Sequence, residues 1–164
     1  MDDKKFDKGL ETLRRIDGGA GEGVIASLED IAPDLGRYIV EFAFGDIYPR
    51  AGLTLEERET ITIASLLTSG GCEAQLKVHI NGSLNVGLSP EKIIEVFIQC
   101  IPYVGFPRVL NGVAVAKTVF EERGLHCLLY TSSREEGRAG RCRPFTAVWR
   151  RQMRRISTKC MFMP

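Results

Sequence analysis

Apolar residues recur along most of this chain at the three- and four-residue intervals of amphipathic helices, in segments separated by short turns. The stretch DGGAGEG at 17–23 contains four glycines, which helices avoid, so we expect a flexible connection there. Residues 91–104 are apolar nearly all round, which predicts burial in the core or in a subunit interface. The pattern predicts an all-α fold, a compact domain of about six helices, with helical segments over residues 3–16, 24–31, 33–48, 54–68, 72–85, 90–104 and 108–124.

Two of these segments have clear start signals. Thr54 followed by Glu57 fits a capping box, in which each side chain satisfies a free backbone N–H group of the other residue. Ser89 before Pro90 supplies a capping hydroxyl and a residue suited to the first helical turn. The β-branched run ETITI at 59–63 would also suit a strand, but the preceding cap and the length of the segment favour a helix.

Charge divides the chain into two parts. Residues 1–124 contain 13 basic and 19 acidic side chains, whereas residues 125–164 contain 9 basic and only 2 acidic ones. The second part also lacks a sustained hydrophobic period, so it cannot build a core of its own. We therefore expect a helical domain over 1–124 and a basic tail over 125–164 that is disordered or non-native. A basic arm that binds nucleic acid or a membrane and a peripheral extension are alternatives. Few aromatic residues accompany the arginines, which disfavours a nucleic-acid arm.

The chain shows no sign of a membrane or secretory role. No run reaches the roughly 18 apolar residues of a membrane helix, and the first 15 residues are charged throughout. We expect a cytoplasmic protein that binds neither membrane nor nucleic acid. The five cysteines are odd in number and their spacings match no zinc pattern, so reduced thiols are expected and no metal site.

One helical stretch carries a row of reactive side chains. On the helix predicted over 72–85, Cys72, Gln75, His79 and Ser83 share one face. The helix N-terminus would favour a thiolate at Cys72, and the imidazole could act as an acid or a base. A simpler interpretation remains open, because isolated cysteines are usually small hydrophobic residues and helical histidines are often structural.

Three stretches, taken in order, carry a family resemblance: FAFGDIYPRAGLTLEERETITIASL, LKVHINGSLNVGLSPEKIIEVFIQ and YVGFPRVLNGVAVAK. The segment from about Phe42 to Val119 resembles the carboxymuconolactone decarboxylase family. The resemblance covers roughly half of the chain directly, and the N-terminal helices of that family can account for most of 1–41. It implies an all-α, alkylhydroperoxidase D-like fold that assembles as a homo-oligomer, a trimer or a hexamer.

The resemblance implies two possible chemistries. One is decarboxylation of a carboxylated lactone. The other is thiol-dependent peroxide reduction, an antioxidant peroxiredoxin activity whose motif is Cys-x-x-Cys-x-x-x-His with a glutamate on the preceding helix. Cys72 and His79 match that motif and Glu59 best matches the glutamate, but Gln75 replaces the second cysteine. A dithiol cycle needs two sulfurs within bonding reach, so a two-cysteine mechanism is disfavoured.

Decarboxylation of a small carboxylated lactone or related acid, without a cofactor, suits the remaining groups better. His79 would be the acid/base, Glu59 its orienting partner, and Gln75 or Tyr103 a hydrogen-bond donor to the small-molecule substrate. Arg58, or the backbone N–H groups near Cys72, would bind an anionic group. Tyr103 could instead only shape the turn between two helices. Two alternatives stay open: a peroxide reductase that uses Cys72 with His79, and a non-catalytic oligomeric binding protein.

Overall fold

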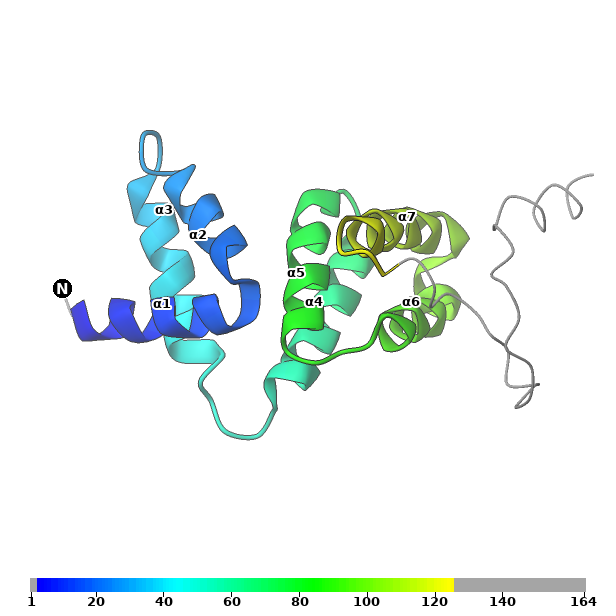
Figure 1. Cartoon of the computed structure of the whole chain (residues 1–164), viewed down its shortest axis with the longest axis horizontal. Helices are drawn as coiled ribbons and strands as arrows, with labels where there is room; N and C mark the ends of the chain where they lie inside the picture. The colour runs from blue at the N-terminus through cyan, green and yellow to red at the C-terminus, as the bar shows by residue number, and fades with distance from the viewer. Residues whose placement is uncertain (1–2, 126–164) are drawn as a thin grey trace, which may run out of the picture. The chain divides into compact units, whose positions relative to one another are not determined.

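The computed structural model describes residues 3–125, which form seven α-helices, one π-helix and no β-strand (Figure 1). The expected all-α fold is confirmed. No helix in this range is long and apolar enough to cross a membrane. The basic tail predicted over 125–164 lies, apart from its first residue, outside the described residues. In chain order the elements are α1 (Asp3–Asp17), α2 (Gly19–Ala26), α3 (Pro33–Tyr38), η1 (Ile39–Ile47), α4 (Leu55–Ser69), α5 (Glu73–Asn85), α6 (Pro90–Val104) and α7 (Phe106–Glu122).

Two hydrophobic clusters hold these helices together. The larger one lies among α4, α5, α6 and α7, and its members include Ile63, Ile80 and Phe97, all fully buried. The smaller one joins α1 to η1 through Leu13, Ile16, Val40 and Phe44. Helix α5 packs against α1 as well as against α4 and α7, so it borders both clusters. The side chains of α5 that face α1 are therefore partly enclosed on two sides.

Both predicted helix starts are confirmed. The backbone N–H of Glu57 donates to Thr54 Oγ1 over 3.2 Å, and the N–H of Thr54 donates to Glu57 Oε2 over 2.7 Å, which completes the capping box of α4. Ser89 Oγ accepts a hydrogen bond from the N–H of Lys92 over 3.3 Å at the start of α6. The run at 59–63 lies inside α4, as expected.

The expected flexible connection at 17–23 is wrong, because most of it belongs to helix α2. A Cβ at Gly21 would lie 2.6 Å from Cδ1 of Leu13, so glycine at this position lets α2 approach α1 closely. Tertiary contact therefore outweighs the low helix propensity of glycine here. The turn itself is confined to Gly18, whose φ of 58° is in the left-handed region that glycine adopts without strain.

The segment 33–48 is helical as predicted, but its second half is a π-helix. Hydrogen bonds in a π-helix join residues five apart, and the N–H of Tyr48 donates to the carbonyl of Ala43 over 2.9 Å. Positions four or five residues apart therefore share a face. Ile39, Ala43, Phe44 and Tyr48 follow that spacing, and all four line the same cavity.

Among the described residues helix α6 is buried on one side only, and burial of its other side in a subunit interface stays a prediction. Ile93 and Phe97 are completely buried, whereas Ile98 is 46% exposed and Tyr103 is 80% exposed. Only one side of α6 therefore contributes to the core that the described residues form.

Candidate functional site

The imidazole of His79 is held by a buried carboxylate from the neighbouring helix. Its Nδ1 lies 3.0 Å from Oε2 of Glu59, which joins α5 to α4. The side chain of Glu59 is completely buried and that of His79 is 21% exposed. Because Nδ1 is engaged by Glu59, Nε2 is the ring nitrogen that remains to act on another molecule.

The second carboxylate oxygen of Glu59 is also occupied. The hydroxyl of Tyr48, just after the π-helix, donates to Oε1 over 2.6 Å. The hydroxyl of Thr62, one turn along α4 from Glu59, lies 3.2 Å from the same phenolic oxygen. Each Glu59 oxygen thus has a partner, which a buried carboxylate requires because burial without hydrogen bonds costs several kcal/mol.

His79 and Tyr48 line a cavity of about 450 Å³, a volume typical of small-molecule sites. Its walls are mostly apolar and come from α1, α2, η1 and α5, while polar side chains line it from α1, α4, α5 and the residue after η1. The lining residues are Leu13, Asp17, Gly21, Val24, Ile25, Ile39, Ala43, Phe44, Tyr48, Thr62, Ala74, Gln75, Val78 and His79. No lysine or arginine is among them.

A second buried carboxyl group lines this cavity. Asp17, the last residue of α1, is only 6% exposed, and its Oδ1 has no hydrogen-bond partner among the described residues. Burial raises the pKa of Asp17 to about 6; the charge of His79 lowers it and the charge of Glu59 raises it. A Cβ at Gly82 would lie 2.7 Å from Asp17 Oδ1 and 3.3 Å from Glu59 Oε2. Glycine at position 82 thus makes room for both carboxyl groups beside α5.

The surroundings of His79 stabilise its charged form. Burial alone would lower the pKa of the imidazole, but the hydrogen bond that its Nδ1–H donates to Glu59, the charge of Glu59 and the charge of Asp17 together raise it above its ordinary value. A histidine with a raised pKa keeps its proton to a higher pH than a free imidazole does and can deliver it into the cavity. Within residues 3–125, no group of three His, Cys, Asp or Glu side chains is placed to hold a metal ion.

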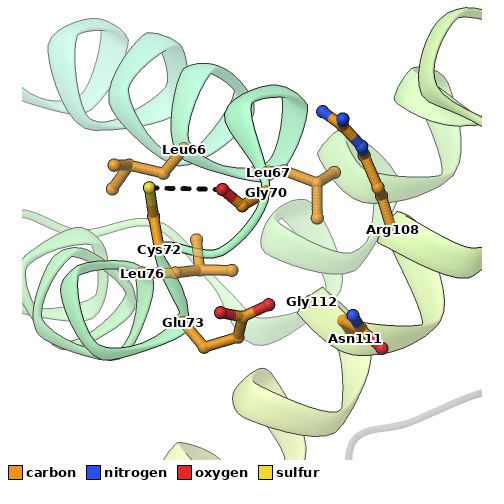
Figure 2. Close-up of a pocket in the computed structure, with 9 residues that line it drawn as sticks. All are labelled: Leu66, Leu67, Gly70, Cys72, Glu73, Leu76, Arg108, Asn111 and Gly112. Carbon is orange, nitrogen blue, oxygen red and sulfur yellow. Dashed lines mark hydrogen bonds between the residues drawn. The ribbon is translucent and has the colours of Figure 1, made fainter.

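Cys72 lies apart from this cavity, although it shares helix α5 with His79. It is the N-cap residue of α5, and its thiol donates to the carbonyl of Gly70 over 3.5 Å. Figure 2 shows the sulfur beside Leu66, in a second and much smaller cavity of about 20 Å³ that Arg108 also lines. A volume of this size holds about one water molecule, so substrate chemistry at the thiol has little room there.

The other predicted site residues separate into two groups. Gln75 lines the larger cavity together with His79. Arg58 does not line it, and its Nη2 donates to the carbonyl of Arg50 over 2.7 Å. Tyr103 is 80% exposed near the end of α6 and does not line it either.

Three polar residues of the cavity were missed by the sequence analysis: Asp17, Tyr48 and Thr62. The glycines that follow Asp17 suggested a turn, and a carboxylate in a turn is ordinarily solvated. Tyr48 ends the aromatic run FAFGDIY. The α-helical period of that run does not predict that the Tyr48 side chain points toward Glu59. No pattern in the sequence signals the π-helix that brings it there.

The chain is similar in sequence to a known family and to three individual proteins. The model of the carboxymuconolactone decarboxylase family matches residues 33–118. A 4-carboxymuconolactone decarboxylase of Acinetobacter baylyi is 29% identical over 125 residues, which cover 76% of this chain and 92% of that protein. A nitrosuccinic acid decarboxylase of Metarhizium robertsii is 24% identical over 120 residues, with 71% and 82% covered. An uncharacterized 15.0 kDa protein of Paracoccus denitrificans is 24% identical over 115 residues, with 70% and 86% covered.

Proposed function

Because the chain belongs to the carboxymuconolactone decarboxylase family, we propose that it is a decarboxylase-like enzyme acting on a small carboxylated lactone or related acid. One observation carries the proposal: His79, held through Nδ1 by the buried Glu59, lines an apolar cavity of about 450 Å³. Two relatives named as decarboxylases of small acids support the same reaction class.

The reaction needs a path for electrons and a source for one proton. The carbon–carboxylate bond breaks and CO₂ leaves, while the bonding electron pair is delocalised into an electron-withdrawing group conjugated with the reacting carbon, such as a lactone carbonyl or a nitro group. That carbon then takes a proton from Nε2 of His79, and the product carries hydrogen where the carboxylate was. Proton transfer from a positioned imidazole typically accelerates such a step by about 10²–10⁴-fold. The proton that His79 gives up returns from solvent, which its partly exposed ring can reach.

The neighbours of His79 act through it or on the substrate. Glu59 orients the ring and stabilises its protonated form, and Tyr48 keeps the Glu59 carboxylate in place. Gln75, on the same helix as His79, is placed to donate a hydrogen bond to a substrate oxygen. The apolar walls lower the polarity around a bound substrate, which strengthens these polar interactions.

Release of CO₂ from 4-carboxymuconolactone and from nitrosuccinic acid by the purified full chain tests the proposal. We expect turnover of at least one of these acids, and a loss of about 10²–10⁴-fold in His79→Ala. Cys72→Ser is the matched control on the same helix, and it should keep the wild-type rate because Cys72 does not line the cavity. A His79→Ala variant with the wild-type rate would refute the role of His79.

The thiol-peroxidase alternative predicts the opposite pattern, with turnover of peroxide lost in Cys72→Ser. No specific contact favours it, since Cys72 and His79 line different cavities and position 75 is a glutamine. Assembly as a homo-oligomer and a cytoplasmic location stay predictions.

A further inference from the structure

The unpartnered carboxyl group of Asp17 is the feature of the cavity that the proposed reaction leaves unexplained. Its Oδ1 is buried and without a hydrogen bond among the described residues, whereas both oxygens of Glu59 have partners. A buried polar atom without a partner costs about 1–3 kcal/mol. Because Asp17 lines the cavity, its carboxyl group can form a hydrogen bond with a ligand there.

We propose that Asp17 binds the substrate as a neutral carboxylic acid, donating a hydrogen bond to a carboxylate or carbonyl oxygen, and that it takes up a proton when an anionic ligand enters the cavity. This inference rests on the proposed function in taking the 450 Å³ cavity as the substrate site. It assigns a recognition role to the end of α1, which no step of the decarboxylation requires.

Charge balance in the site supports a neutral Asp17. The ionisable groups that face it are Glu59 from α4, His79 from α5 and the phenol of Tyr48 after η1. On α1 and α2, Arg14 is paired with Glu22 at the surface over 2.7 Å. Protonated His79 compensates one carboxylate, so an ionised Asp17 leaves one net negative charge.

An anionic substrate would add a second negative charge to this site. The cavity lining includes no lysine or arginine to compensate it. Uptake of one proton by Asp17 removes the repulsion and converts the carboxyl group into a hydrogen-bond donor. With a pKa already raised to about 6, Asp17 needs only a modest further shift to be protonated at neutral pH. The ligand class that fits is a compact acid with a carboxylate next to an apolar or lactone body.

Calorimetry with a stable probe measures the proton directly. The probe is 5-oxotetrahydrofuran-2-carboxylate, a saturated lactone acid, titrated into the full chain in buffers of different ionisation enthalpy. At pH 7 we expect the wild type to take up as much as about 0.9 proton per bound ligand, because a group with a pKa of about 6 starts about one-tenth protonated.

Variants at position 17 identify the group that takes up the proton. Asp17→Asn keeps a donor, so it should bind the probe without this uptake and with little change in affinity between about pH 6 and pH 8. Asp17→Ala should bind about tenfold more weakly, through loss of one hydrogen bond. Asp7→Asn, an exposed change on the same helix, should behave like the wild type.

Three results would overturn the inference: no binding of the probe at millimolar concentration, wild-type proton uptake in Asp17→Asn, or tighter binding as the pH rises. The last would mean that ionised Asp17 accepts a hydrogen bond from the ligand. A different result would refute the proposed function without refuting the role of Asp17. A chain that binds the probe with Asp17-dependent uptake but releases no CO₂ from either acid would refute decarboxylation and leave the role of Asp17 standing.

Discussion

Replacing Asp17 with asparagine should stabilise the folded protein at neutral pH, although it removes a group that we place in the substrate site. Burial raises the pKa of this carboxyl from 3.8 to about 6, with His79 lowering it and Glu59 raising it. An acid with a higher pKa in the folded state than in the unfolded state binds its proton more tightly when folded. The free energy of unfolding therefore falls as the pH rises from about 4 to about 6, and it stays lowered above that range.

The size of the effect follows from the shift. Each pKa unit corresponds to about 1.4 kcal/mol, so the shift of about two units costs the folded protein about 3 kcal/mol at pH 7. Part of this is offset, because the charge of Asp17 also helps to raise the pKa of His79. We expect Asp17→Asn to raise the free energy of unfolding by about 1–3 kcal/mol at pH 7, and by much less at pH 4.

Urea unfolding followed by circular dichroism between pH 4 and pH 8 measures this difference. The exposed Asp7→Asn change on the same helix is the matched control and should show no pH-dependent gain. A difference between Asp17→Asn and the wild type that stays constant across the pH range would refute the reasoning. It would mean that Asp17 is ionised in the folded protein as easily as in the unfolded one.

Two further predictions concern the partners of Glu59. Glu59→Gln should lower the pKa of His79, since both the hydrogen bond and the charge of Glu59 raise it, and should slow decarboxylation by about 10²–10⁴-fold. An NMR titration of the His79 ring measures the shift, with the exposed Glu56→Gln on the same helix as control; an unchanged midpoint would contradict the coupling. Tyr48→Phe removes the donor to Glu59 Oε1 and should lower the free energy of unfolding by about 1–3 kcal/mol. Denaturant unfolding tests this against Tyr38→Phe, which changes an exposed ring, and equal stability of the two variants would contradict it.

Local patterns sufficed for much of the helical framework. The capping box at Thr54 and Glu57 and the capping serine at Ser89 depend on side chains within three residues of one another, so the sequence alone located these helix starts. The same holds for the helix that carries His79, whose predicted span over 72–85 differs from α5 by one residue.

Local sequence patterns did not predict the features that depend on contacts between distant segments. The glycines of α2 indicated a loop by propensity, but Gly21 serves the close approach to Leu13 on α1. The π-helical register of η1 has no sequence signature, yet it determines that Tyr48 faces Glu59. Both α2 and η1 pack against α1, and a helical period in the sequence cannot reveal those contacts.

The residues of the candidate site also fall into those that the sequence predicted and those that only the tertiary structure identified. The sequence by itself determined the all-α framework, the helix carrying His79 and, through the family resemblance, Glu59 as a partner for its imidazole. Only the tertiary structure separated Cys72 from His79 and placed Asp17 and Tyr48 around the same cavity. The physical reason is that helical spacing fixes which residues share a face over a few turns. Which cavity a face borders, and which carboxyl groups lose their water, depends on how the helices pack.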